Sequence, residues 1–269
     1  MPEISVITGV CRSTYIQKQI EYLSKQTFKD FEWVVVDEQY MQNKGLKAGF
    51  PIIHIPPKNP KPYFAKASCL NDGLTLASGK LIYFMNDYVL PMKSCLQRHW
   101  EIQEKYKGIM LSGRAYKIDI KPEDIKENVR YKTTDYRMHL FDQGWFSWTP
   151  IEEGLFEVDR RGIENWMNGR NDSCPLEPLL DCNGFDESFD GRWGNEDADM
   201  AYRLMTYGLK FFMDKQSAVM EFPHQSGERA AIRTEAEQQA LLLKITHKKV
   251  LDRIYTANEH RNLRREGNG

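Results

Sequence analysis

The stretch LNDGLTLASGKLIYFMNDY, residues 70–88, contains the pattern that decides the fold. It begins inside a helical period that covers about residues 65–78, and Gly79 is a typical residue to end such a helix. The apolar run at 81–85 has the length of a buried strand and breaks off before Asp87. A helix followed by an apolar strand predicts an α/β unit. An acid at the carboxyl end of such a strand is a common ligand-holding position in open sheets.

The segments around this unit repeat the alternation of strand and helix. Residues 3–9 and 31–37 are apolar runs of strand length, and a helical period begins at Ser13 between them. The run FEWVVVD at 31–37 is apolar on both faces, as a buried parallel strand requires. Further predicted elements are an extended strand in the proline-rich residues 51–62, a helix from Pro91 to Tyr106, and a strand at 109–112. The alternation predicts an α/β fold with a mostly parallel sheet.

The second half of the chain is less regular. Residues 115–175 show no clear period, and long irregular stretches of this kind are often functional loops. Regular structure is predicted again for a helix at 195–207, two strands at 210–213 and 217–222, and a final helix at about 232–257 before a basic tail.

The bulk composition disfavours several classes of protein. Lys and Arg number 37 against 38 Asp and Glu, so no net field selects nucleic acid or an anionic membrane. The five cysteines contain no CxxC spacing, which argues against a disulfide framework and a structural zinc site. No apolar run approaches the roughly 20 residues that cross a bilayer, and no signal peptide is evident. A soluble, cytoplasmic protein is therefore expected. Nucleic acid is not an expected partner, although the basic tail leaves that possibility open.

The stretch NGFDESFDGRWGNEDADMAYRL, residues 183–204, is the most informative about chemistry. It places Glu196 and Asp197 in the first turn of a predicted helix, where the helix dipole favours ionised carboxylates. Such an acid suits a general base that must stay unprotonated at neutral pH. The alternative is that Asn195, Glu196 and Asp197 only cap the helix.

Taken in order, these motifs resemble the inverting glycosyltransferases of family 2, which have the GT-A fold. NGFDE, WGNED and AYRL are similar to the acceptor-side signature of that family, and ISVITGVCR and FEWVVVDE to its first two strands. Residues 69–91 resemble its helix, glycine, strand and Asp-x-Asp turn. The resemblance covers about residues 3–224. It implies a nucleotide-sugar-binding half at 1–115, an acceptor-binding and catalytic half at 116–231, and a C-terminal helix and basic tail at 232–269.

The resemblance also implies a reaction and roles for single residues. A sugar would pass from a nucleotide-diphosphate donor, in the first instance a UDP-sugar, to a hydroxyl of a glycan or related acceptor. The displacement is in line, so the base faces the acceptor opposite the leaving diphosphate. Asp197 would be this base and Glu196 would hold the acceptor. The implied donor-binding residues are Thr8, Gly9, Asp37, Lys66, Asn86, Asp87 and Trp193. Stacking on sugar rings is also open to Trp145, Trp148 and Trp166.

The Asp-x-Asp turn departs from the family pattern. Asn86 stands at its first position and Asp87 at its middle position, while Tyr88 replaces the last acid, which usually binds the metal. Asp87 and His224 then become the candidate ligands for a divalent cation, Mn²⁺ or Mg²⁺. Alternatively, cationic side chains neutralise the diphosphate. The candidates for that task are Lys66, Arg192 and Arg229.

The sequence leaves two other functions open. The altered turn also fits a catalytically inactive sugar-nucleotide-binding module. A glycosyltransferase that acts on a modified DNA base is the second, although the neutral net charge disfavours duplex DNA. Further departures from the family, at Gly9, Cys11 and Arg12 after the first strand, all affect the donor side.

Overall fold

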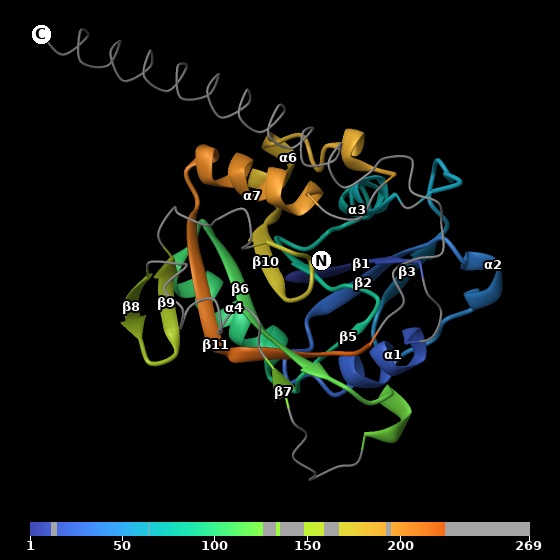
Figure 1. The fold of residues 1–269 in the computed structure, drawn as a ribbon, viewed down its shortest axis with the longest axis horizontal. Helices are drawn as coiled ribbons and strands as arrows, with labels where there is room; N and C mark the ends of the chain where they lie inside the picture. Colours follow the sequence, from blue (N-terminus) through green and yellow to red (C-terminus); the bar gives the residue numbers. More distant parts are fainter. Residues whose placement is uncertain are drawn as a thin grey trace, which may run out of the picture.

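The computed structural model describes residues 1–11, 15–63, 65–125, 133–134, 148–158, 167–191 and 195–223. The predicted final helix at 232–257 and the tail lie outside these residues. Within the described chain one mixed sheet is flanked by helices on both faces, which gives three layers (Figure 1).

The strands of the first half are β1 (Ile4–Val10), β2 (Phe31–Asp37), β3 (Ile52–Ile55), β4 (Leu81–Phe84), β5 (Val89–Pro91) and β6 (Ile109–Ile118). Those of the second half are β7 (Thr133–Thr134), β8 (Trp148–Glu152), β9 (Leu155–Val158), β10 (Asp172–Pro175) and β11 (Lys210–Glu221). The α-helices are α1 (Ile16–Ser24), α2 (Tyr40–Asn43), α3 (Lys66–Leu74), α4 (Cys95–Tyr106), α6 (Leu176–Asp181) and α7 (Glu196–Tyr207). Two short 3-10 helices are η1 (Pro122–Asp124) and η3 (Glu187–Phe189).

The sheet combines strands from both halves of the chain. Its order is β3-β2-β1-β4-β10-β6-β11-β9-β8, with β5 also paired to β11 and β7 to β6. Strands β3, β2, β1 and β4 are parallel, as are β6 and β11. Strand β10 is antiparallel to both of its neighbours, β4 and β6. The predicted α/β architecture is therefore present, and one strand from the second half fills the middle of the sheet.

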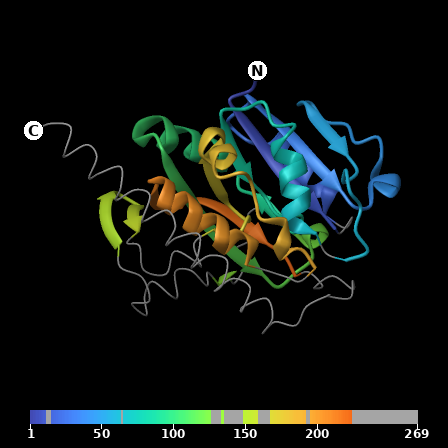
Figure 2. The same cartoon turned by 90° about the horizontal axis from the view of Figure 1, so that it is seen from above.

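Helices α3, α6 and α7 cover one face of the sheet (Figures 1 and 2). Their apolar side chains, such as Leu70 and Leu74 of α3 and Leu204 of α7, pack with Ile7 and Phe84 of the sheet. Because neighbouring residues of a strand point to opposite faces, the two sides of β1 contribute to two separate cores. These helices bring residues from distant parts of the sequence to the same face.

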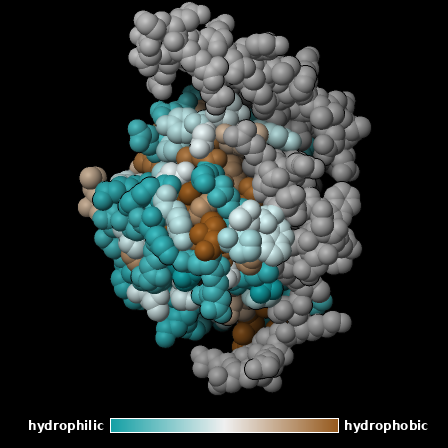
Figure 3. All heavy atoms as spheres, turned by 90° about the vertical axis from the view of Figure 1, so that its left-hand side faces the viewer, coloured by the Kyte–Doolittle hydropathy of each residue, from teal (hydrophilic) through white to brown (hydrophobic). Residues whose placement is uncertain are grey.

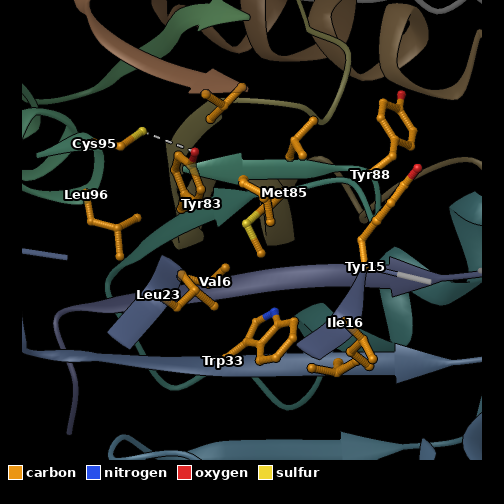
Figure 4. Close-up of a cluster of buried hydrophobic side chains, with 14 of the residues drawn as sticks. Val6, Tyr15, Ile16, Leu23, Trp33, Tyr83, Met85, Tyr88, Cys95 and Leu96 are labelled. Carbon is orange, nitrogen blue, oxygen red and sulfur yellow. Dashed lines mark hydrogen bonds between the residues drawn. The ribbon is translucent and has the colours of Figure 1, made fainter. Parts of the chain in front are cut away.

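Helices α1 and α4 pack on the opposite face, around a second core (Figure 4). Val6 and Trp33 lie there beside Leu23 of α1, and Tyr83 points toward Cys95 of α4. Burying an indole N–H is unfavourable unless it is bonded. The Nε1 of Trp33 donates to the hydroxyl of Thr8 at 2.9 Å, which meets that need.

Several predicted boundaries were wrong, for identifiable physical reasons. Pro91 does not open a helix: it ends β5, which pairs with β11, and α4 begins only at Cys95. Helix α3 ends at Leu74, before Gly79. A Cβ on Gly79 would lie 2.5 Å from the backbone nitrogen of Ser5, so the glycine permits close packing on β1 instead of ending the helix.

The second half contains more regular structure than its sequence indicates. The stretch expected to be irregular, 115–175, includes β8, β9 and β10. The two strands predicted at 210–213 and 217–222 form one strand, β11, whose register with β6 is irregular between Asp214 and Ala218.

The described surface is mainly polar on the face that carries the end of the sheet at β8 and β9. Hydrophilic side chains predominate there, with small apolar areas between them (Figure 3). Among the described helices, none combines the length and the apolar character that a membrane-spanning segment needs.

Candidate active site

The carboxyl ends of β1, β2 and β4 meet at one edge of the sheet because the strands are parallel neighbours. A chain of hydrogen bonds connects the acids at this edge. The backbone N–H of Gln39 donates to Asp37 at 2.7 Å, and the Gln39 side chain donates to the carbonyl of Cys11 at 2.7 Å. The N–H of Cys11 in turn donates to Asp87 at 3.0 Å. The structure therefore brings together two acids that are fifty positions apart in the sequence.

Asp37 is one of the residues that line a small pocket. Its carboxylate is fully buried and also accepts a bond from the Asn43 side chain at 2.9 Å, while the His54 Nε2 lies 3.0 Å away. The pocket has a volume of about 340 Å³, near the lower end of the range for ligand sites. Its lining includes Asp37, Glu38, Tyr40, Met41, Pro57 and Lys61.

Thr8 and Gly9 lie on β1 next to this pocket but are not among its lining residues. The Thr8 side chain is fully buried on the α1 side, where its hydroxyl accepts the Trp33 bond. Gly9 faces α3, and a Cβ at this position would lie 3.3 Å from the Cβ of Cys69. Any contact of Thr8 with a ligand would therefore be made by its backbone.

The turn after β4 is held by its own side chains. The Asn86 amide donates to the Tyr88 hydroxyl at 2.8 Å and to the carbonyl of Asn168 at 3.2 Å. Asp87 is buried, and its Oδ2 lies 3.4 Å from the Cys11 thiol. Burial raises the pKa of Tyr88 to about 12, so this phenol is neutral and does not replace the negative charge of the usual metal-binding acid.

A loop before β10 closes over this turn. Asp172 accepts the N–H groups of Asn168 at 2.9 Å and Gly169 at 2.7 Å. Gly169 has a φ of +67°, and a Cβ there would lie 3.1 Å from Asn86 Oδ1 and 3.3 Å from Lys66 Nζ. The position requires glycine for both reasons. It lies against Asn86 on one side and Lys66 on the other.

Helix α7 presents its first acids to α3. Asn195 precedes the helix with a φ of 81° and makes no side-chain cap bond, so the alternative reading of this residue as a helix cap does not hold. Lys66, the first residue of α3, places its Nζ 2.9 Å from Glu196 and 3.6 Å from Asp197. Lys66, expected beside the donor, thus pairs with the two predicted catalytic acids.

The electrostatic environment of Asp197 differs from the expectation. Burial, followed by the neighbouring Glu196 charge, raises the pKa of Asp197 to about 6, and Lys66 opposes this rise. The sequence indicated only that the helix dipole favours the ionised form at this position, whereas burial in the folded chain outweighs the dipole and raises the pKa. For Lys66, burial disfavours the ammonium form, but Glu196 and Asp197 outweigh it and raise its pKa. At pH 7 Asp197 is still mainly ionised.

Asp190 is a structural residue of the site that the sequence did not reveal. Its buried carboxylate accepts the N–H of Ala67 at 2.9 Å, the Ser68 hydroxyl, and the Lys61 Nζ at 2.8 Å. It thereby caps α3 from the loop that precedes α7. Only its place in the acid-rich stretch 183–204 could have suggested it.

Several predicted residues lie outside the described chain, namely Trp145, Trp166, Arg192, Trp193, His224 and Arg229. Trp148 is described, and it stacks edge-on against Phe156 in the β8–β9 hairpin.

Comparison with known proteins gives a consistent result. The sequence model of one protein family, described as the N-terminal domain of galactosyltransferase, matches residues 171–225. A validoxylamine A glucosyltransferase of Streptomyces hygroscopicus subsp. jinggangensis (strain 5008) is 27% identical over 177 residues, which cover 62% of this chain and 41% of that protein. A second, from subsp. limoneus, is also 27% identical and is covered to 38%. The chain therefore spans about two fifths of these curated relatives.

Solved structures share the fold. GalNAc-T7, crystallised with UDP, GalNAc and Mn²⁺, superposes with a TM-score of 0.65 at 12% identity, over 91% of this chain and 48% of that one. S. aureus TarS 1-349 in complex with UDP-GlcNAc gives 0.59 at 15% identity, over 95% of this chain and 73% of that one. These likenesses confirm the GT-A fold and, with the family match, the resemblance to glycosyltransferases that the sequence indicated.

Proposed function

We propose that this chain, which has the GT-A fold, is an inverting glycosyltransferase that moves a sugar from a nucleoside diphosphate to a hydroxyl group. The observation that carries the proposal is the position of Asp197. It lies in a cluster with Glu196 and Lys66, and through Gly169 this cluster adjoins the turn that holds Asn86. An acid poised as a base beside a turn at the carboxyl ends of parallel strands suits transfer between a bound nucleotide and a second substrate.

The proposed reaction needs one base. Asp197 removes the proton of the acceptor hydroxyl while the hydroxyl oxygen attacks the anomeric carbon. The bond from that carbon to the diphosphate oxygen breaks, its electron pair leaves with the nucleoside diphosphate, and the proton stays on Asp197. Glu196 orients the acceptor. A base with a pKa of about 6 is ionised at neutral pH and still accepts a proton readily.

The donor side rests on the pocket at Asp37. Its fixed carboxylate and its apolar lining suit a nucleotide base, with the sugar diphosphate directed toward Asp87. UDP is the first candidate, because UDP or a UDP-sugar is bound in the two similar structures. The acceptor is a glycan or another hydroxyl compound.

A divalent cation fits this site if the protein supplies few of its ligands. Asp87 supplies the hard carboxylate oxygen that Mg²⁺ or Mn²⁺ prefers, and the second proposed ligand is His224. In the described ranges no group of three or more His, Cys, Asp or Glu side chains is placed to hold a metal. The donor set thus suits a cation that takes its other ligands from the diphosphate and water. Such a cation supplies positive charge to the leaving group.

The first test is Asp197→Asn. The base is lost while the shape of the side chain is kept, so transfer should fall by about 10²- to 10⁴-fold. The affinity for UDP, measured by calorimetry, should stay within about twofold of wild type, because the Asp37 pocket is untouched. Asp181→Asn, on an exposed helix end, is the matched control and should leave both quantities unchanged. Loss of UDP binding in Asp197→Asn would remove this residue from the role of base.

The second test is Asp87→Ala. Its UDP affinity should fall in the presence of Mn²⁺ and be nearly equal to wild type with a chelator, since the carboxylate acts through the cation. Equal weakening in both conditions would indicate a site without metal. Release of nucleotide from UDP-, GDP- and dTDP-sugars, followed with and without acceptors, identifies the donor. Binding of a donor without hydrolysis or transfer would favour an inactive binding module instead.

A further inference from the structure

We propose that Lys66 is a positioning residue for the base: it joins the first turns of α3 and α7 and supplies the charge that holds Asp197 ionised. This inference rests on the proposed function for its catalytic meaning. It assigns Lys66 to the acceptor side of the reaction, whereas the sequence placed it beside the leaving diphosphate.

The geometry of the Lys66 side chain supports this assignment. Its Nζ lies 2.9 Å from Glu196 Oε1 and 3.6 Å from Asp197 Oδ2, and the side chain is only 16% exposed. A Cβ on Gly169 would lie 3.3 Å from Nζ and 3.5 Å from Cε, so the loop before β10 limits the space on that side. A lysine held between two acids and a glycine backbone has little freedom to reach a distant phosphate. Its contacts fix the relative position of two helices that are 130 residues apart in the sequence.

Lys66 is itself held by the acceptor loop. Asp190 bonds the N–H groups of Ala67 and Ser68, the two residues that follow Lys66 on α3. The start of α3 is therefore fixed twice from the loop and helix that contain the catalytic acids, once at its backbone and once through the lysine. A side chain that is anchored in this way positions its partners precisely enough to matter for a proton transfer.

The charges around Asp197 come from three elements. Glu196 on α7 and Asp172 on β10 disfavour its ionised form, and burial acts in the same direction. Among the side chains that the structure describes, Lys66 on α3 is the cation that opposes them. Two neighbouring carboxylates without a cation between them do not both stay ionised. Lys66, together with the Ala198 N–H that Asp197 accepts, therefore favours the ionised form of Asp197.

The test is a titration of Asp197 in the full chain, followed by ¹³C NMR of labelled side-chain carboxyls and assigned with Asp197→Asn. In Lys66→Met the pKa of Asp197 should rise by about one pH unit or more, the effect of removing an opposite charge at this distance. Lys66→Arg should keep the wild-type value. The matched control is Lys58→Met, which removes a half-exposed lysine that pairs with Asp72 of α3 and not with Asp197. It should not change the titration of Asp197.

A second readout is the pH dependence of transfer. In Lys66→Met the acid limb of kcat/KM should move upward, with about a two- to tenfold loss at pH 7 that disappears above about pH 9. A purely structural defect would not be recovered at high pH. If Lys66→Met does not fold, as judged by circular dichroism, Lys66→Met with Glu196→Gln is compared with Glu196→Gln alone. The double variant should again show the higher pKa.

The outcomes separate the two proposals. An unchanged Asp197 titration in Lys66→Met, or an equal shift in Lys58→Met, overturns the role of Lys66. The titration needs no substrate, so a shift confined to Lys66→Met supports that role in any case. If the same wild-type protein neither hydrolyses nor transfers any donor sugar, the proposed function fails while the electrostatic role of Lys66 stands.

Discussion

The ionised carboxylate of Asp197 should lower the free energy of unfolding of the protein at neutral pH. Its pKa is raised from 3.8 to about 6 in the folded state, so folding disfavours its ionised form. Each pH unit of pKa difference corresponds to about 1.4 kcal/mol, which makes the cost at pH 7 about 3 kcal/mol. The pKa of Asp197 is higher in the folded state than in the unfolded chain. The free energy of unfolding therefore keeps its full contribution from this group below about pH 4, where the carboxyl is protonated in both states. This contribution is lost as the pH rises through about 6.

Asp197→Asn removes this cost because the amide is neutral at every pH. Asn also keeps the oxygen that accepts the N–H of Ala198 at 2.9 Å. The variant should therefore be more stable than wild type by about 3 kcal/mol at pH 7 and equal to it near pH 4. Under the proposed function, the variant would gain stability while losing the base, which is the usual opposition between activity and stability.

The assay is urea unfolding of both proteins at several pH values between 4 and 8, with the free energy of unfolding taken from linear extrapolation. Asp190→Asn is the control, with an expected change of opposite sign. Lys61 and the start of α3 bind the Asp190 carboxylate, so this variant should be less stable than wild type at pH 7. A variant Asp197→Asn that is equal to or less stable than wild type at pH 7 would refute the assigned environment of this acid.

Two further predictions concern the same region. The kcat/KM for transfer should fall about tenfold for each pH unit below about 6, because only ionised Asp197 accepts the proton. If the same fall in kcat/KM at low pH persists in Asp197→Asn, another group is responsible for it. Gly169→Ala should lower both the free energy of unfolding and transfer, since its Cβ would crowd Asn86 and Lys66. Gly45→Ala is its control, with a similarly positive φ of +87° and no atom within 4 Å, and it should show only the backbone strain of about 1 kcal/mol.

The sequence predicted those elements whose pattern is local. The run FEWVVVD matches β2 in both bounds, because a strand buried on both faces carries apolar residues on both of them. Helix α7 was also predicted, to within one residue of its start, and the structure shows Gly208 in the left-handed conformation after its last residue. Strand β10 was missed because its sequence, DSCP, has no apolar pattern. Its Asp172 is fully buried but is satisfied by hydrogen bonds from elsewhere in the fold.

The site shows the same division. Glu196 and Asp197 were recognisable from their place at the start of a helix. The contact of Lys66 with them, and of Asp190 with α3, joins segments more than 120 positions apart and has no local signature. The direction of the Asp197 pKa shift could not be predicted either. Burial depends on the assembled fold, and in this case it outweighs the dipole of the helix that the sequence does reveal.

The insertion of β10 between β4 and β6 has a consequence for biosynthesis. Both neighbours are complete once residue 118 has been made, but the strand that joins them ends at Pro175. During translation, more than fifty residues must leave the ribosome while two strand edges stay uncovered. The nascent chain therefore passes through a stage with exposed hydrogen-bonding groups, in which chaperone binding would be most useful. A fragment that ends at residue 118 should therefore aggregate, as followed by light scattering, because both strand edges stay uncovered.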